Sequence, residues 1–301
     1  MAAMDGSMRA ARRLCQWLEQ HVPDFCSDTH RLDGLIRVAE FTIVLLGLTR
    51  PLSSGASGDV YARWAHGVAD VLWADLHRKE KYVLRSLAAT RSTHARALLL
   101  PFPALETITR RRFDNHALVR ALLSEGAGRT GHLEVDVAFT CDVAGLRDCR
   151  EVTCTRLAEL SGAAGPPGES VQGMYDLTHL AFYATILGRR AAHWSPGMAG
   201  WARAFLEEGG AVFLRRHDLD LVAECVMSLL ITGSPTSRYV HAAAEALAAV
   251  AERGNGMPPH PRHADDAGSA FANRYHPTLV GLAALAEYDR RMPHSRWLQA
   301  T

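Results

Sequence analysis

The sequence has no excess of charge of either sign. Its 301 residues include 33 Lys and Arg against 32 Asp and Glu, which leaves a formal net charge of +1. Proteins that bind nucleic acid concentrate Lys and Arg to neutralise phosphates, so we expect no nucleic-acid partner. The basic cluster Arg110-Arg111-Arg112 stands between apolar segments and is interpreted as a solvated helix end.

Long hydrophobic runs and paired cysteines are also lacking. The longest apolar run, 43–48, is far shorter than the ~20 residues needed to cross a bilayer, and the N-terminus shows no signal-peptide pattern. The six cysteines show no CxxC spacing. We therefore expect a cytoplasmic protein with reduced thiols and no membrane partner.

Several enzyme motifs are absent as well. The chain has no P-loop, no GxGxxG after a strand, no GxSxG turn and no HExxH. Cys141, Cys149 and Cys154 lie near one another, but their spacing matches no zinc pattern. These absences argue against nucleotide-dependent enzymes and α/β-hydrolases, and we expect neither a cofactor nor a bound metal.

Helical periodicity is what the sequence does have. Apolar residues recur at spacings of three and four over long windows, which predicts an all-α fold. The segment 132–139 also alternates as a strand would, but a helix is favoured there. We expect one helical domain, 1–301, with possible subdomains 1–130 and 131–301. Strong helices are predicted at 170–187, 196–213, 219–231, 236–252 and 275–288.

The arrangement of these helices is predicted to be antiparallel pairs closing into a single α/α toroid or an incomplete ring. Such a ring leaves a central cleft in which a polar pocket can form. The stretch 254–266 is too rich in Pro, Gly and polar residues for a helix, and a loop of this length could serve as a lid.

A polar-aromatic cluster interrupts the helix at 170–187. Tyr175 and His179 are four residues apart and share a helix face with Phe182 or Tyr183, while Asp176 lies beside them. A histidine can act as acid, base or neutral ligand near neutral pH. The structural alternative is a core histidine satisfied by a hydroxyl or a carbonyl group.

Two further residues complete the candidate site. Glu224 is the acid left unexplained in an apolar helix once Asp218 and Asp220 are assigned to the helix N-terminus; an ion pair with Arg215, Arg216 or Arg274 is the alternative. Tyr275-His276-Pro277 is expected at a helix start, where proline is tolerated and the histidine is accessible. His179, Glu224 and His276 could form an acid-base constellation or a two-histidine, one-carboxylate metal set.

Three phrases carry a resemblance: 175–185 (YDLTHLAFYAT), 219–225 (LDLVAEC) and 275–280 (YHPTLV). They resemble a family of uncharacterised helical proteins of actinobacteria, often encoded beside natural-product biosynthesis genes, with a Thr-His-x-x-Phe-Tyr motif. The chain departs from that family where Ile186-Leu187-Gly188 replaces an Asp-Phe-Gly-like end. The expected helical ring is also similar to the toroid of lanthionine cyclases, although their zinc-binding motifs are missing here.

The resemblance implies a tailoring enzyme acting on a small-molecule or peptide biosynthetic intermediate, including a ribosomally made peptide, by cyclisation, elimination or addition. His179, His276 and Glu224 would be catalytic, and Tyr175, Asp176, Tyr183 and Tyr275 would bind the substrate. The alternative is a non-catalytic helical scaffold that holds a precursor peptide or a partner enzyme. A homodimer is a further possible assembly.

Overall fold

The computed structural model describes residues 2–29, 31–51, 59–90, 93–124, 132–163, 165–234, 237–259 and 270–291. Within these ranges every regular element is a helix and no strand occurs, which confirms the all-α class. The segment that also fitted a strand is helix α8 (His132–Val143). The closed ring stays a prediction. No helix in the described ranges is both long and apolar enough to span a bilayer.

The chain divides into two compact units. Unit 1 comprises Met1–Gln20 and Arg156–Thr301, and unit 2 comprises His21–Thr155. The subdivision suggested by the sequence, between 130 and 131, therefore falls inside unit 2. Helix α9 (Arg150–Ala163) crosses the boundary between the two units.

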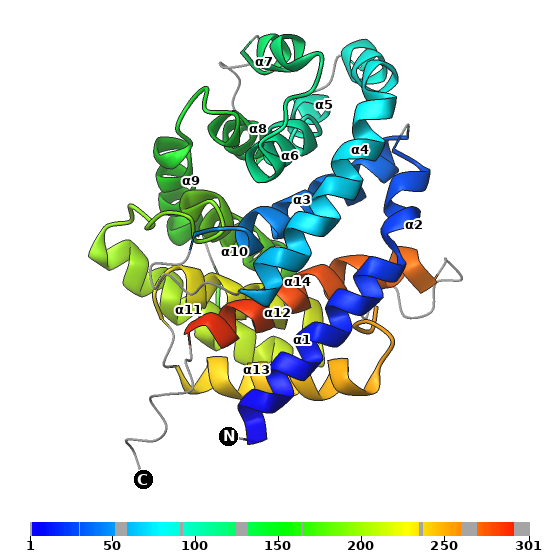
Figure 1. The fold of residues 1–301 in the computed structure, drawn as a ribbon. Helices are drawn as coiled ribbons and strands as arrows, with labels where there is room; N and C mark the ends of the chain where they lie inside the picture. Colours follow the sequence, from blue (N-terminus) through cyan, green and yellow to red (C-terminus); the bar gives the residue numbers. More distant parts are fainter. Residues whose placement is uncertain are drawn as a thin grey trace. The chain divides into compact units, whose positions relative to one another are not determined.

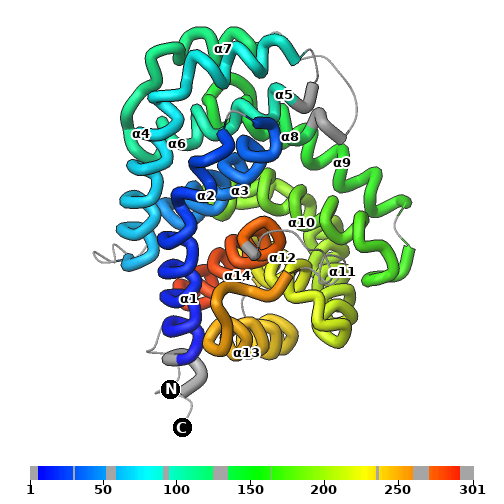
Figure 2. Tube along the Cα trace, turned by 90° about the vertical axis from the view of Figure 1, so that its right-hand side faces the viewer, coloured from blue at the N-terminus to red at the C-terminus, as the bar shows by residue number. Residues whose placement is uncertain are grey.

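Unit 1 is organised around one buried helix. All 13 residues of α12 (Leu219–Ile231) are buried, which explains its apolar sequence on every side. Its neighbours in the unit are α10 (Val171–Thr185), α11 (Pro196–Arg215), α13 (Arg238–Arg253) and α14 (Ala270–Arg291), and α1 (Ala2–Gln20) packs on α13 and α14. Figures 1 and 2 show α1, in blue, lying alongside α13 and α14 from the other end of the chain.

The first residues of the predicted lid loop are fixed to unit 1. Gly256 has φ of 81°, and a Cβ there would lie 2.9 Å from the Trp17 ring. Met257 is buried, and its backbone N–H donates to Thr278 Oγ1 at 2.9 Å. Residues 260–266 of the predicted lid lie outside the described ranges.

Unit 2 has a core rich in aromatic rings. Its helices are α2 (Val22–Ser27), α3 (Leu32–Leu48), α4 (Val60–Ala89), α5 (Thr93–Ala97), α6 (Pro101–Thr109), α7 (His116–Ser124) and α8. Phe25 packs on Phe41 with ring centroids 4.5 Å apart, and Phe102 packs edge-on against Phe113 at 4.9 Å. Asp59 caps α4, because its carboxylate accepts from the N–H groups of Tyr61 and Ala62.

Candidate functional site

Helix α10 presents His179 between aromatic rings. The Ser170 hydroxyl accepts from Gly173 N and starts the helix. From there the 3.6-residue repeat places Tyr175, Phe182 and Tyr183 around His179, with ring centroids 6.2, 6.1 and 5.9 Å from the imidazole. The predicted shared face is confirmed, and it includes both Phe182 and Tyr183.

Helix α12 carries two buried carboxylates one turn apart. Asp218 caps the helix by accepting from Leu221 N at 3.4 Å. Asp220 and Glu224 follow at a spacing of four residues, so they lie on the same face. Both are buried, and Glu224 is fully enclosed. Asp220 lies in the first turn of α12, as the sequence interpretation expected, and its side chain also contacts Tyr175 and His276.

Helix α14 brings in His276 from a position that the sequence did not predict. The helix begins at Ala270, so the expected start at Tyr275 is wrong and Pro277 lies inside the helix. The proline was taken as a first-turn signal, but it lies seven residues after the start of the helix, where it costs a backbone hydrogen bond. The His276 side chain is still accessible, with 29% of its surface exposed.

The three predicted catalytic residues converge on one atom. Glu224 Oε1 lies 3.4 Å from His276 Nε2 and 3.8 Å from His179 Nε2. His276 Nε2 also lies 3.5 Å from Asp220 Oδ1. Three helices therefore bring two imidazoles and two carboxylates together within unit 1.

Two hydroxyl groups hold the other carboxylate oxygens. Thr178 Oγ1 donates to Glu224 Oε2, and Tyr175 OH donates to Asp220 Oδ2. By contrast, Glu224 Oε1 and Asp220 Oδ1 are buried and have no hydrogen-bond partner among the described residues. Each carboxylate is thus fixed on one side and directed at the histidines on the other, at distances longer than a hydrogen bond.

The environment shifts the pKa values of the two carboxyls in opposite directions. Burial acts to raise the pKa of Glu224, but His179 and His276 outweigh it and lower that pKa to about 2. Burial raises the pKa of Asp220; His276 opposes this and the nearby Glu224 charge adds to it. Burial, together with Asp220, also raises the pKa of Tyr175, so its hydroxyl remains a hydrogen-bond donor.

The predicted substrate-binding residues are only partly at this cluster. Tyr175 and Tyr183 flank His179, and Tyr275 lies edge-on to His276 with centroids 6.3 Å apart. Asp176 accepts from Gln172 Nε2 at 2.7 Å along α10. That bond gives Asp176 a local partner on its own helix, and no contact places it with the two carboxylates.

Two of the three arginines suggested as partners of Glu224 bond elsewhere. Arg216 donates to Gly168 O at 3.1 Å and Arg274 to Asn255 O at 3.2 Å. In the described residues the ion-pair partners of Glu224 are the two histidines. The structure therefore favours the histidine interpretation over the arginine one.

Asp220 and Thr178 are the site residues that the sequence reasoning missed. The spacing of four between Asp220 and Glu224, in a helix otherwise apolar, was a signal that both acids share a face. Thr178 gave no comparable signal, because threonine is common on helices and its partner lies 46 residues away.

The comparison with known families covers most of the chain. The sequence profile of a family described as "Domain of unknown function (DUF6895)" matches residues 11–286. No curated protein and no solved structure matches the chain. The chain belongs to the DUF6895 family.

Proposed function

We propose that this member of the DUF6895 family is an enzyme that uses His179 and His276 for general acid-base catalysis. The observation that carries the proposal is that two accessible imidazoles share the buried oxygen Glu224 Oε1. Enzymes place a histidine beside a buried carboxylate to orient the ring and to stabilise its charged form.

Accessibility distinguishes the roles within the cluster. The side chain of His179 is 45% exposed, whereas that of Glu224 is 1% exposed. A ligand can therefore reach the histidines but not the carboxylate. His179 and His276 would exchange protons with the substrate, Glu224 would orient both rings, and Thr178 would hold Glu224.

The aromatic rings beside His179 support an organic substrate. Tyr175, Phe182 and Tyr183 surround the imidazole on α10, and such rings provide apolar contact area with polar ends. A peptide or polyketide-like biosynthetic intermediate, undergoing cyclisation, elimination or addition, is the substrate class that we propose. Those reactions need a proton removed at one atom and delivered at another, which two histidines can divide between them.

The test is a product screen with matched variants. Candidate linear and dehydrated peptides and polyketide-like acyl compounds are incubated with the protein, and products are followed by mass spectrometry and chromatographic retention. His179→Ala and His276→Ala are each expected to lower kcat by about 10²–10⁴-fold while substrate binding persists. His66→Ala, at an exposed position on α4, is the control and should leave kcat unchanged.

The scaffold alternative predicts another outcome of the same screen. A non-catalytic protein would bind a peptide without converting it, and His179→Ala would weaken binding rather than turnover. Binding without any product, across compounds that bind to the wild type, would contradict the catalytic proposal.

A metal-dependent enzyme is a second candidate, and one set of interatomic distances favours it. The nitrogen-oxygen separations of 3.4 to 3.8 Å around Glu224 Oε1 resemble the separation of neighbouring ligands on a tetrahedral ion, about 3.4 Å for bonds near 2.1 Å. Against this, among the described residues only His77, Glu80 and Asp114 in unit 2 have three potential ligand atoms that all lie within 4.8 Å of one another. The cluster around Glu224 does not meet this criterion. Metal analysis of protein purified without chelator, for wild type and Glu224→Gln, decides between the two mechanisms.

A further inference from the structure

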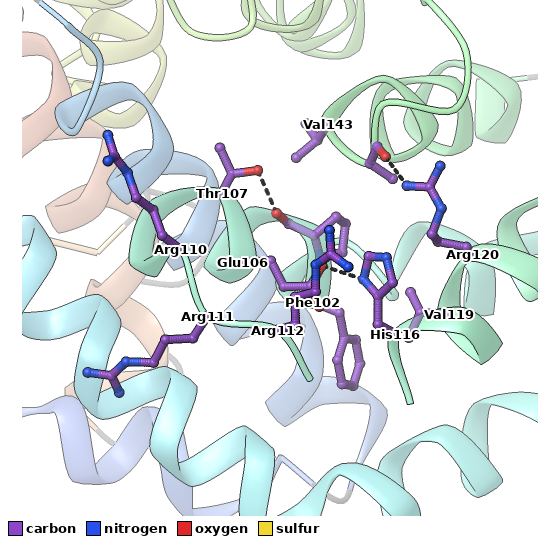
Figure 3. Close-up of a pocket in the computed structure, with 12 residues that line it drawn as sticks. Phe102, Glu106, Thr107, Arg110, Arg111, Arg112, His116, Val119, Arg120 and Val143 are labelled. Atoms are coloured by element: carbon purple, nitrogen blue, oxygen red, sulfur yellow. Dashed lines mark hydrogen bonds and ion pairs between the residues drawn. The ribbon is translucent and has the colours of Figure 1, made fainter. Parts of the chain in front are cut away.

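Unit 2 contains a cavity that the cluster around Glu224 does not use. The cavity has a volume of about 270 Å³ and lies at the C-terminal end of α6, the start of α7 and the end of α8. Figure 3 shows the side chains that line it, among them Arg110, Arg111, Arg112, His116 and Arg120. The basic cluster read as a solvated helix end is exposed, as expected, but it also forms part of a cavity wall.

The local backbone explains why the three arginines lie beside the cavity. Arg110 ends α6 in the left-handed conformation, with φ of 58°, and its N–H donates to Glu106 O. The chain therefore leaves the helical path after Thr109, and the next three residues line the cavity before α7 begins. A continued helix would have spread these three arginines around its axis instead.

Two of the lining arginines have protein partners. Arg111 pairs with Asp70 at 3.0 Å and stacks on the Trp73 ring at 5.1 Å. Arg120 donates to Ala144 O at 2.6 Å, which fixes its guanidinium group at the wall with further donors unused by that bond. Figure 3 shows this bond at the edge of the cavity.

In the part of the chain that the structure describes, Arg110 and Arg112 have no partners of the kind that hold Arg111 and Arg120. Neither has a carboxylate within ion-pair distance among the described residues. In the view of Figure 3, Arg112 extends towards Glu106 and His116, whereas Arg110 and Arg111 extend away from them. Arg112 is therefore the lining arginine that has no ion-pair partner among the described residues and extends towards Glu106 and His116 in this view.

The acidic residue of the lining, Glu106, already bonds to other groups of the protein. Glu106 Oε2 lies 2.7 Å from His116 Nδ1, and Glu106 Oε1 accepts from Phe113 N at 2.9 Å. Both carboxylate oxygens are thus bonded, and the histidine balances the charge when it is protonated. The three arginines of the lining that have no carboxylate partner among the described residues outnumber its one glutamate, so the lining is positive. Arg111, which is paired with Asp70, does not add to this excess.

We propose that this cavity binds an oxyanion, the phosphate or carboxylate group of a small molecule. A guanidinium group presents paired N–H donors that match the oxygens of either group. The volume lies below the roughly 300–1,000 Å³ of drug-sized ligand pockets, so the ligand is small. The proposal stands independently of the acid-base function assigned to unit 1.

Calorimetric titration with inorganic phosphate, and separately with acetate, tests the proposal at constant ionic strength in buffer free of both anions. Saturable binding of at least one anion is expected, and the stronger of the two identifies the group. Arg112→Gln should weaken that binding about tenfold, the loss of one charge-assisted contact.

Arg111→Gln is the matched control, because it removes the same charge from the neighbouring residue that is already paired with Asp70. It should change the affinity by less than about twofold. Circular dichroism of both variants establishes that each is folded. If neither anion binds saturably, or if both variants lose affinity equally, the cavity is not an oxyanion site.

Discussion

Asp220 and Glu224 lie one turn apart on a fully buried helix, yet their pKa values move in opposite directions. The two histidines hold Glu224 as a carboxylate, while burial and the neighbouring charge favour the protonated form of Asp220. Carboxyl pairs whose environments separate their pKa values are a frequent basis for dividing acid and base roles. The pair therefore gives the cluster two carboxyl groups with different preferred states.

Replacing Glu224 by glutamine should destabilise the fold at neutral pH. The pKa of Glu224 in the folded state, about 2, is below its ordinary value of 4.5, so ionised Glu224 contributes stability above pH ~4.5, which is lost as pH falls through about 2. Glu224→Gln should cost about 1–3 kcal/mol at pH 7. Chemical denaturation at pH 7 and pH 3.5 checks this.

The difference in the free energy of unfolding between Glu224→Gln and wild type should be smaller at pH 3.5 than at pH 7. Glu207→Gln is the control, because Glu207 forms a partly exposed pair with Arg203 on α11 and should cost under about 1 kcal/mol. A Glu224→Gln protein as stable as wild type at pH 7 would mean that the histidines do not stabilise the carboxylate.

Asp220→Asn should show the opposite pH dependence to Glu224→Gln: its stability relative to wild type should increase as the pH rises. The pKa of Asp220 is raised above its ordinary value of 3.8, so its stability contribution is present below pH 3.8 and is lost as pH rises through the folded-state pKa. Asparagine stays neutral, so the melting temperature of the variant relative to wild type should rise from pH 4 to pH 8. A relative melting temperature that falls over this range would contradict the assigned shift.

Thr178→Val tests the hydroxyl that holds Glu224. Valine keeps the side-chain shape but leaves Glu224 Oε2 without its donor in a buried position, so a loss of about 1–3 kcal/mol is expected. Thr178→Ser keeps the hydroxyl and should retain most of that hydrogen-bond energy. Equal losses in urea unfolding of the two variants would show that the methyl group, rather than the hydrogen bond, matters.

Two glycines of α11 should respond to alanine with opposite signs. A Cβ at Gly210 would lie 2.3 Å from the Tyr239 hydroxyl oxygen, and that hydroxyl bonds to Val222 O. A Cβ at Gly200 meets nothing within 4 Å. Gly210→Ala should therefore destabilise by about 1–3 kcal/mol, and Gly200→Ala should stabilise by up to about 1 kcal/mol; thermal unfolding measures both.

The sequence predicts the helices of unit 1 well where ordinary signals mark their ends. The predicted range of α12, 219–231, matches Leu219–Ile231, because Asp218 is a normal N-cap. The predicted end of α10 at 187 is wrong, because the helix stops at Thr185 and Ile186 takes φ of 45°. A β-branched residue rarely adopts that conformation, so no local pattern indicates a helix end there.

The residues of the candidate site could be predicted from the sequence, but the fact that they lie together could not. His179, Glu224 and His276 stood out because each is polar within an apolar helix, whereas their meeting depends on how α10, α12 and α14 pack. The arginines beside α6 were assigned correctly to a helix end. Their cavity depends on the left-handed turn at Arg110, which tertiary packing selects.

The membership of α1 in unit 1 has a consequence for synthesis on the ribosome. Ser7 bonds to Asp289, and Arg9 pairs with Glu252 at 3.1 Å. Helix α1 is translated before unit 2, whereas its partners α13 and α14 are translated after unit 2. Unit 2, which lies between them in sequence, can complete its own contacts while α1 still exposes its apolar face. The nascent chain therefore carries α1 without its packing partners until α13 and α14 have been made.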